Sequence, residues 1–513
     1  MALLRLPPVV RLNAVMATHR QLQSNIAWLQ RARIDHPRAL SSSPPRLKEQ
    51  PSPPDATQAE EAASAAASAS SPSPKPKPTS PDNVKDEEQK RWEDDPDWNI
   101  TAFSQLPYAT FGYNQHMRIN ADFKESLRQM LWQFRAPIRY AIAYGSGVFA
   151  QTDPNAPPTP PNLSPHPNPP EAIVKWQKGG GKMIDFIFGV SHTQHWHSLN
   201  LHQHRDHYSF LGSLGSGAVS RVQDKFGAGV YFNPYITLNG TLVKYGVVNL
   251  DTLTDDLSTW STLYLAGRLH KPVKILRDDP RVRLANQINL LGAVRTALLL
   301  LPESFTEADL YTAIASLSYT GDPRMSPALA AEHPSKVRNI VTRQLPNFRQ
   351  LYAPLIRDLP NLTWTGEGLW PPPDDVLAQE AVAGGAADAP DVRLAQDLDP
   401  NRRANMVRRL PRCLRERVYA AYQAKWRMGR AEYEALLAET RDEDPAGFRR
   451  REAGEVDRRV AAEADLPDVV RRAVYQTVMW PATVQSVKSF FTAGWGRSMR
   501  YMREKREKGR QGK

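Results

Sequence analysis

The stretch Met183–Val190, MIDFIFGV, is an apolar run interrupted by one carboxylate, Asp185. A short, nearly continuous apolar run is typical of a strand that is buried on both faces of its sheet. Helices must then cover both faces, which predicts a mixed α+β protein. Something must also compensate the charge of Asp185, since an unpaired carboxylate in apolar surroundings is costly. Two solutions are open: a divalent cation such as Mg²⁺, or a salt bridge with backbone hydrogen bonds at a strand end.

A glycine turn precedes this strand in the sequence. The segment YAIAYGSG predicts a short strand that ends at Tyr144 and continues into Gly145, Ser146 and Gly147. Because glycine has no side chain, backbone N–H groups in such a turn can approach phosphate oxygens closely. A Gly-Ser-Gly sequence alone is more often only a turn, so it indicates a phosphate site only in combination with Asp185.

Six of the twelve histidines lie between His192 and His207. They suggest a zinc site, and hence a zinc hydrolase, but the HExxH pattern is absent and the single cysteine, Cys413, excludes a multi-thiolate site within one chain. Neutral imidazoles also donate hydrogen bonds to phosphate groups. Substrate positioning and plain packing are therefore both favoured over a zinc site, and the histidines expected to position a substrate are His195, His197, His204 and His207.

Two further charged residues stand out. Lys244 lies in a predicted strand, LVKYGVV, where an ammonium is hard to bury; a triphosphate partner fits, and so does an outward-facing lysine. Asp256 belongs to a group of acids with Asp251 and Asp255 at the start of a predicted helix. Acids at that place are expected as helix caps, and a metal-binding role is the less common alternative.

Composition divides the chain into segments. The first 34 residues contain arginine but no acid, which predicts a mitochondrial presequence, with a disordered basic tail as the alternative. Prolines, serines and alanines then dominate a segment that cannot bury a core. The predicted order is presequence 1–40, disordered linker 41–95, catalytic domain 96–278 with a proline-rich insertion at 154–170, helical domain 279–370, acidic loop 371–400 and C-terminal helical region 401–513.

The C-terminal helix carries an apolar stripe at three- and four-residue steps, with a strongly basic end after it. The stripe consists of Val484, Val487, Phe491, Trp495, Met499 and Met502. This pattern fits a helix that lies on an anionic membrane surface, and it equally fits a helix docked on the protein's own core. The net charge of +12 agrees with a phosphate-rich partner, and no apolar run is long enough to span a bilayer.

The glycine turn, the apolar run with the histidines that follow it, and the strand of Lys244 resemble the mitochondrial translocator assembly and maintenance protein family, the peripheral phosphatidate cytidylyltransferases of mitochondria. GDPRM at 321–325 and HPSKVRNIV at 333–341 belong to the same resemblance. The resemblance implies a nucleotidyltransferase-fold domain, then a winged-helix-like domain and a C-terminal amphipathic helix. It implies Mg²⁺-dependent synthesis of CDP-diacylglycerol from CTP and phosphatidic acid on the matrix side of the inner membrane, for cardiolipin synthesis. Nucleic acid is not an expected partner.

The resemblance also assigns residues. It places the triphosphate at the turn of Gly145, Ser146 and Gly147 and a metal ion at Asp185. The chemistry of the implied reaction adds two expectations: Lys244 neutralises the departing pyrophosphate, and the histidines hold the lipid phosphate. The fold usually carries a second acid two residues from the first, but Met183 and Ile187 are apolar here. The second metal ligand is therefore open among Asp206, Asp251, Asp255 and Asp256, and of these we name Asp256 as the expected ligand. A non-catalytic membrane scaffold and a polynucleotide nucleotidyltransferase are further alternatives.

Overall fold

A computed structural model describes residues 92–93, 96–149, 183–325, 335–357, 359–364, 392–440 and 452–493 of the chain. The predicted presequence and the proline-rich insertion lie outside the described residues, as does the predicted linker except for Trp92 and Glu93. Trp92 packs edge-on against Phe111, with ring centroids 4.7 Å apart, so the described fold begins a few residues earlier than the expected boundary at 96.

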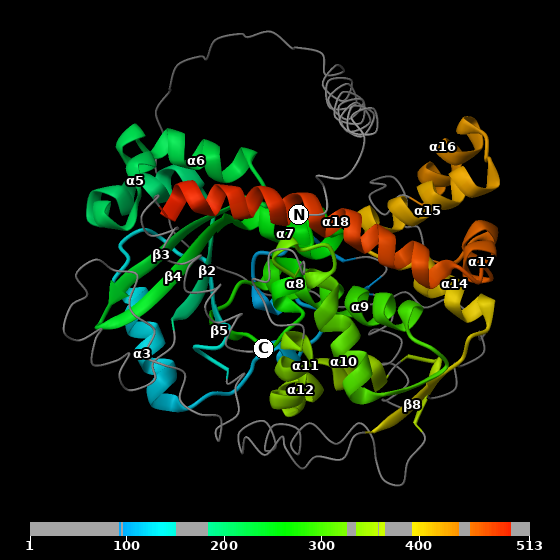
Figure 1. The fold of residues 1–513 in the computed structure, drawn as a ribbon. Helices are drawn as coiled ribbons and strands as arrows, with labels where there is room; N and C mark the ends of the chain where they lie inside the picture. The colour runs from blue at the N-terminus through cyan, green and yellow to red at the C-terminus, as the bar shows by residue number, and fades with distance from the viewer. Residues whose placement is uncertain are drawn as a thin grey trace, which may run out of the picture. The chain divides into compact units, whose positions relative to one another are not determined.

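A five-stranded mixed sheet forms the first half of the fold, in the order β3-β4-β2-β1-β5 (Figure 1). The central strand β2 pairs antiparallel with β1 and parallel with β4. The strands are β1 Tyr140–Tyr144, β2 Ile184–Val190, β3 Val230–Leu238, β4 Thr241–Asn249 and β5 Lys274–Arg277. The accompanying helices are α3 Ala121–Trp132, α5 Thr193–Gln203, α6 Ser216–Lys225, α7 Leu250–Thr259 and α8 Ala266–Leu269.

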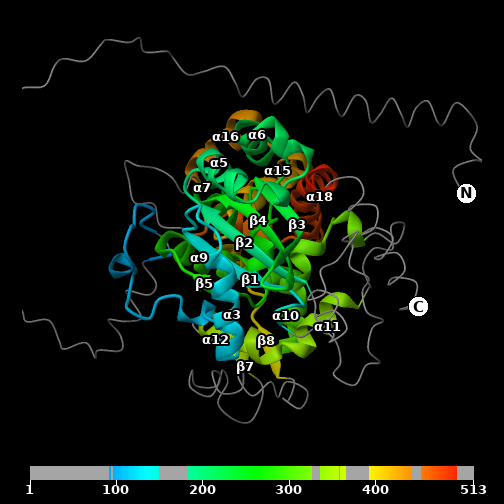
Figure 2. The same ribbon diagram turned by 90° about the vertical axis from the view of Figure 1, so that its left-hand side faces the viewer.

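Both faces of this sheet are covered, as the apolar run predicts. Ile184, Phe186 and Phe188 of β2 point into one core, which they share with Trp196 of α5 and with side chains of α3. Ile187 points into the opposite core, which includes side chains of α7 and of the long helix α9, Pro280–Leu300. Figure 2 shows α3 on the near side of β1 and β2. The predicted α+β class is confirmed.

The second half continues from α9 into a small three-stranded sheet, ordered β6-β8-β7. Its elements are β6 Ser304–Thr306, α10 Glu307–Ser316, α11 Lys336–Arg343, α12 Leu345–Arg357, β7 Leu362–Trp364 and β8 Arg393–Gln396. Strand β8 lies inside the segment 371–400 expected to be a loop, and it pairs with both other strands. The prediction missed it because four residues with alternating burial give little sequence signal beside an Ala/Gly-rich segment.

The C-terminal region is helical, as expected, and comprises α14 Pro400–Arg408, α15 Arg412–Trp426, α16 Arg430–Glu439, α17 Glu455–Ala461 and α18 Leu466–Ala493. Helix α18 extends back to the first sheet and lies beside β3 (Figures 1 and 2). None of the helices within the described ranges combines the length and the apolar character that a bilayer span requires. Short 3-10 helices complete the described fold: η2 Phe103–Gln105, η3 Tyr113–Gln115, η4 Arg205–His207, η5 Phe210–Leu214, η6 Leu317–Tyr319 and η7 Pro323–Met325.

The inner face of α18 changes character along its length. Val474 and Val478 in its first half are buried apolar residues, whereas Gln485, Lys488 and Thr492 in its second half are buried polar residues. The Lys488 ammonium donates hydrogen bonds to the carbonyls of Val222, Gln223 and Phe226 at the end of α6, at 3.2, 3.1 and 2.7 Å. Those carbonyls have no partner within their own helix, so a lysine caps them favourably. The second half of α18 therefore docks through polar contacts.

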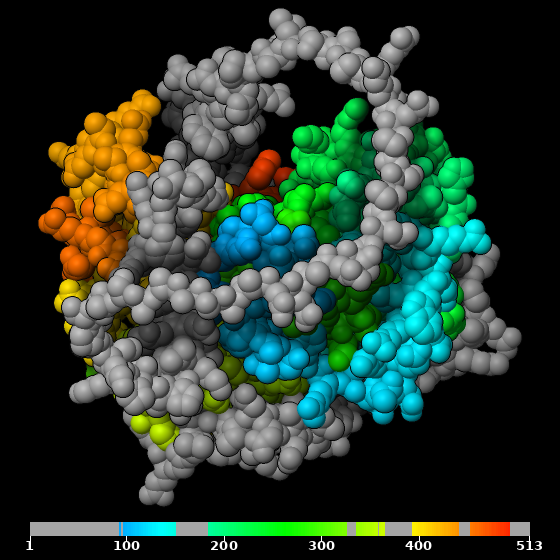
Figure 3. Space-filling model, turned by 180° about the vertical axis from the view of Figure 1, so that it is seen from behind, coloured from blue at the N-terminus to red at the C-terminus, as the bar shows by residue number. Residues whose placement is uncertain are grey.

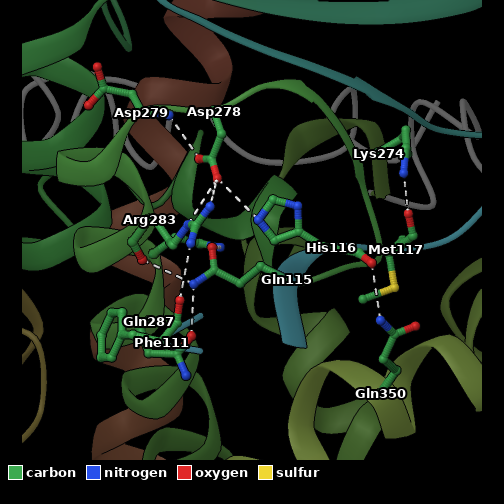
Figure 4. A network of polar contacts seen from close by, with 11 residues as sticks. Phe111, Gln115, His116, Met117, Lys274, Asp278, Asp279, Arg283, Gln287 and Gln350 are labelled. Atoms are coloured by element: carbon green, nitrogen blue, oxygen red, sulfur yellow. Dashed lines mark hydrogen bonds and ion pairs between the residues drawn. The ribbon is translucent and has the colours of Figure 1, made fainter. Parts of the chain in front are cut away.

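A polar network fastens the N-terminal segment to the rest of the fold (Figure 4). Asp278 accepts hydrogen bonds from Arg283 and lies 3.1 Å from His116 Nε2, while Gln115 donates to Gln287 at 2.7 Å. Burial raises the pKa of Asp278, but hydrogen bonds from His116 and Arg283 outweigh it and hold that pKa below its ordinary value. Figure 3 shows this segment, in blue, on the face opposite to that of Figure 1, where Phe111 packs against Leu284 of α9.

Candidate functional site

The glycine turn passes directly over the carboxylate of Asp185. Asp185 lies opposite Tyr144 of β1, and Gly145 follows that strand with φ +83°. A Cβ atom on Gly145 would lie 3.3 Å from Asp185 Oδ2, and one on Gly147 would lie 2.5 Å from the Met183 carbonyl oxygen. Positive φ and close approach both require glycine at such positions. The turn and the strand carboxylate, which lie far apart in the sequence, therefore form one site.

Lys244 completes this site from the other side of β2. It is the register partner of Asp185 in β4, and its Nζ lies 3.3 Å from Asp185 Oδ1. The same ammonium lies 4.5 Å from the ring centroid of Phe232. The side chains of Lys244 and Asp185 are 30% and 26% exposed, so the pair is accessible from solvent. The salt bridge is one of the two expected ways to compensate the charge of Asp185.

Arg268 of α8 is a site residue that the sequence analysis missed. Its guanidinium lies 3.8 Å from the ring centroid of Tyr264 and 5.9 Å from that of Phe232, so it shares the Phe232 ring with Lys244. Its charge also acts on the Tyr144 hydroxyl. Burial and then the charge of Asp185 raise the pKa of Tyr144, while the charges of Arg268 and Lys244 act against them. Nothing in the local sequence, AGRL, distinguishes this arginine from a surface residue.

The histidines lie on the other side of the sheet. Tyr245 follows Lys244 in β4 and so points to the opposite face, where its hydroxyl lies 2.9 Å from His207 Nδ1. His204 stacks on His207 with ring centroids 4.3 Å apart, and His195 is exposed on α5. This placement does not support the predicted role of these residues in holding a lipid phosphate beside Asp185.

His197 is enclosed among other polar side chains on that face. Its Nδ1 lies 2.8 Å from the Tyr208 hydroxyl and its Nε2 lies 2.8 Å from Gln223 Oε1. Burial lowers the pKa of His197 to about 4, although the Gln223 hydrogen bond opposes the shift. The ring is therefore neutral at physiological pH with both nitrogens engaged, which leaves it no atom for a substrate.

One group in the described part of the chain has the composition of a metal site. Ligand atoms of His204, Asp206 and His207 lie within 4.8 Å of one another. The Nδ1 atom of His207 already contacts the Tyr245 hydroxyl, and the rings of His204 and His207 are parallel. This group is separated by the sheet from Asp185 and the glycine turn.

Asp256 has a structural role that the sequence analysis did not anticipate. Its carboxylate is 2% exposed and accepts hydrogen bonds from backbone N–H groups of the following loop and of the start of α8. The backbone donors are Thr262, Leu263, Leu265 and Ala266, at 2.7, 2.8, 2.8 and 3.0 Å. Both oxygens are occupied by these bonds, which contradicts the expectation that Asp256 is the second metal ligand. By fixing the start of α8, the carboxylate positions Arg268 indirectly.

We expect Asp256→Asn to lower the free energy of unfolding by about 2–4 kcal/mol, because an NH2 group would replace one of the two accepting oxygens and would face two backbone donors. Thermal or urea unfolding measures the change. Asp255→Asn is the matched control, since Asp255 is exposed one position earlier on α7. Unchanged stability of Asp256→Asn with complete loss of activity would instead favour a metal-binding role.

The geometry thus defines an α+β protein with a strand carboxylate under a glycine turn and two cations beside it. Such a site suits phosphate groups. Residues 127–508 match the family model described as "Phosphatidate cytidylyltransferase, mitochondrial", and the chain belongs to this family. The family resemblance seen in the sequence is confirmed.

Proteins carrying the same name are similar over much of the chain. The Xenopus laevis protein is 36% identical over 380 residues, covering 74% of this chain and 92% of the relative. The Mus musculus protein is 35% identical over 384 residues, covering 74% of this chain and 94% of the relative. The Schizosaccharomyces pombe protein is 43% identical over 243 residues, covering 47% of this chain and 56% of the relative.

Proposed function

We propose that this protein is a phosphatidate cytidylyltransferase, which makes CDP-diacylglycerol and pyrophosphate from CTP and phosphatidic acid. Membership of the family and the names of its relatives support the reaction. The single structural observation that carries the proposal is the placement of Asp185 beneath the Gly145 turn with Lys244 3.3 Å away. A triphosphate needs such a combination of backbone donors and cations.

The reaction needs positioning and charge neutralisation more than a protein nucleophile. A phosphate oxygen of phosphatidic acid forms a bond to the α-phosphorus of CTP, and the bond from that phosphorus to the β-phosphate bridging oxygen breaks. Pyrophosphate leaves with the electron pair. The backbone of the Gly145–Gly147 turn would hold the triphosphate, while Lys244 and Arg268 would stabilise the negative charge that grows on the leaving group.

The residues present fit one Mg²⁺ ion. Asp185 Oδ1 contacts Lys244, whereas Oδ2 faces the glycine turn where the triphosphate would lie. Mg²⁺ binds through one or two carboxylates together with substrate phosphates, so a single aspartate suffices when nucleotide supplies the remaining ligands. When bound, the ion supplies Lewis-acid charge neutralisation at the phosphates. This arrangement leaves Lys244 and Arg268 to act on the leaving group.

We also propose that the two halves are a nucleotidyltransferase-fold domain and a winged-helix-like domain. In the first half, the glycine turn and Asp185 occupy adjacent antiparallel strands, as that fold requires. The second half has the element order helix, strand, helices, strand, strand, which supports a winged-helix-like domain. These elements are α9, β6, α10 to α12, β7 and β8. The antiparallel order β6-β8-β7 supports the same interpretation.

The site of action that fits the family is the mitochondrion, with the protein attached peripherally to the matrix side of the inner membrane and its product used for cardiolipin. The outer face of α18 supports attachment, because Trp480, Val487 and Phe491 are 68%, 56% and 50% exposed. The second half of α18 packs on the protein through a polar face and leaves its apolar face exposed. An amphipathic helix on a protein surface usually has the opposite orientation. An exposed apolar helix face with an aromatic residue suits the interface of an anionic membrane.

Replacing Trp480, Val487 and Phe491 by serine should weaken binding to cardiolipin-containing vesicles by at least about tenfold, because each side chain buries apolar area in the interface. Vesicle flotation measures the bound fraction. Trp132→Ser is the matched control, because Trp132 is equally exposed, at 72%, on α3. Equal loss in the control, or no loss in the triple variant, would remove α18 as the attachment surface.

The proposed reaction is tested by incubating the purified protein with CTP labelled at the α-phosphate, Mg²⁺ and vesicles that contain phosphatidic acid. Label should enter the lipid fraction only when phosphatidic acid is present, with an equal amount of pyrophosphate released. Label transferred to RNA would indicate a polynucleotide nucleotidyltransferase instead. Vesicle binding without any turnover of CTP would indicate a scaffold.

A further inference from the structure

The ring of Phe232, in β3, is near both cations of the site. Lys244 Nζ lies 4.5 Å from the ring centroid, and the Arg268 guanidinium lies 5.9 Å from the same point. At both distances the face of an aromatic ring attracts a cation, and the attraction is stronger where water is excluded. Phe232 is 2% exposed. One buried ring therefore attracts two charges that come from different elements, β4 and α8.

The ring reaches this place because β4 carries a glycine opposite it. Phe232 pairs with Gly246 across the two strands. A Cβ atom on Gly246 would lie 2.6 Å from Phe232 Cε1 and 2.9 Å from Ile187 Cδ1, so a larger residue would displace the ring. Gly246 is two residues from Lys244 and lies on the same face of β4. The glycine thus allows the ring to lie across β4 beside the lysine.

A β-bulge follows Phe232 in β3, at the level of the lysine. The register of β3 against β4 shifts between Asn233 and Ile236. As a result, Pro234 and Tyr235 together oppose the single residue Lys244. Tyr235 has φ +60°, a value that an aromatic residue seldom adopts. Bulges redirect side chains and are common next to active sites, so this distortion is expected where a strand positions a functional group.

The segment that carries Arg268 has an unusual backbone as well. Trp260 and Leu263, in the loop between α7 and α8, have φ values of +57° and +54°. The Asp256 carboxylate holds this loop by accepting from its backbone N–H groups. Three of the five non-glycine residues with positive φ in the described part of the chain therefore belong to the two segments that meet at Phe232. Such conformations persist only where the surrounding structure enforces them, and they are concentrated at functional sites.

Packing alone does not require an aromatic ring at this position. Phe232 shares a core with Ile187, and a core residue needs only apolar volume and a suitable shape. The face of the ring has a further effect on the two cations. Lysine and arginine side chains lose much conformational freedom when they are fixed, and a ring that fixes both before the substrate binds lowers that entropic cost during the reaction.

We propose that Phe232 is a positioning residue for the leaving group, whose ring holds Lys244 and Arg268 so that both charges reach the same phosphate. This inference rests on the proposed function, in which the pyrophosphate of CTP leaves beside these two cations. It adds that the cations act as a unit and that β3, through its bulge and the opposing glycine of β4, sets their spacing.

The first test is Phe232→Leu, because leucine keeps the apolar character and removes the aromatic face. We expect kcat/KM for CTP to fall about tenfold, the combined effect of two weakened cation–π contacts. Phe188→Leu is the matched control, since Phe188 is 1% exposed in β2 and packs on the opposite face of the sheet. Both variants should lose stability, but only Phe232→Leu should lose activity. Equal losses of activity, or none in Phe232→Leu, would overturn the proposal.

Phe232→Tyr tests whether the ring itself is required. It keeps the aromatic face, and its kcat/KM for CTP should lie within about threefold of the wild type. A folded Phe232→Tyr protein that is as slow as Phe232→Leu would contradict the assignment, because a cation–π contact depends on the ring.

A double-mutant cycle with Lys244→Gln tests whether the ring acts through the cations. Beside Lys244→Gln, Phe232→Leu should lower kcat/KM for CTP by at most about threefold, because only Arg268 then still depends on the ring. A full tenfold loss in this background as well would show that the ring acts independently of the lysine, which would overturn the proposal.

Binding of pyrophosphate with Mg²⁺, measured by calorimetry, separates this proposal from the proposed function. Phe232→Leu should weaken this binding about fivefold, whereas Phe188→Leu should leave it unchanged. Equal binding by the two variants would remove the positioning role of Phe232. Failure of the proposed function is recognised differently, because wild-type protein would then form no labelled lipid at any concentration of phosphatidic acid, whatever its affinity for pyrophosphate.

Discussion

Asp185→Asn should lower kcat for CDP-diacylglycerol formation by at least about 1,000-fold, equivalent to about 4 kcal/mol of transition-state stabilisation. The reason is that an amide oxygen binds Mg²⁺ far more weakly than a carboxylate, and within the described residues Asp185 is the acid that lies against Gly145. Transfer of label from α-labelled CTP to lipid measures the rate. Asn preserves the size of the side chain, so the glycine turn above it is not disturbed.

Asp206→Asn is the matched control for this experiment. Asp206 is exposed beside His204 and His207, on the opposite side of the sheet, and its loss should leave the rate within about twofold of wild type. Both variants should unfold at nearly the wild-type temperature, because the Asp185–Lys244 pair is partly exposed and stabilises the fold little. A large loss of rate in Asp206→Asn with little loss in Asp185→Asn would instead indicate that the active site is at the histidine group.

Lys244→Gln should lower kcat/KM for CTP by about 100-fold, a typical effect of removing one group that stabilises charge in the transition state. Lys244 is the only predicted site residue that contacts Asp185 by an ion pair, and its stacking on Phe232 fixes the ammonium at the site. Lys244→Arg should recover part of the loss, because the charge remains while its geometry changes. Steady-state rates at varied CTP concentration measure both variants.

Lys124→Gln on α3 is the matched control, and we expect its kcat/KM for CTP to equal that of the wild type. A fall in stability of Lys244→Gln that accounts for all of its lost activity would argue that the lysine only neutralises Asp185. Calorimetric binding of CTP separates the two explanations, since a purely structural lysine leaves the affinity of the folded fraction unchanged.

The sequence was most informative where a pattern is local. The apolar run of β2 requires cover on both faces, and the strand before Gly145 ends where the GSG turn begins, so the sheet and its turn could be predicted. That Asp185 and Lys244 meet depends on the parallel register of β2 and β4. Their chemistry suggested a shared site, but a register between strands more than fifty residues apart is not visible in local periodicity.

The histidines show where local reasoning failed. Their density in the sequence suggested a function, yet the face on which they lie follows from the alternation of Lys244 and Tyr245 in β4. That His207 contacts Tyr245 is a tertiary contact which the sequence does not reveal. Asp256 was misassigned for a different reason: backbone N–H groups of a loop, which no residue pattern reveals, satisfy its carboxylate.

The role of Arg268 could not be foreseen, because tertiary packing places it. Its position depends on the contact between Gly267 and Ser318 and on the aromatic ring of Tyr264. For the C-terminal helix, the structure shows docking of its inner face on the protein, while Val487 and Phe491 of the stripe are exposed; attachment to a membrane stays a prediction. The later stripe residues, Trp495, Met499 and Met502, lie outside the described residues.

The most direct test of the central claim is the position of a manganese ion in crystals grown with CTP and Mn²⁺, located by its anomalous scattering. We predict a peak within coordination distance of the Asp185 carboxylate, with the CTP phosphates beneath the turn formed by residues 145–147. A peak at His204, Asp206 and His207, with Asp185 still paired to Lys244 and no nucleotide at the turn, would contradict it.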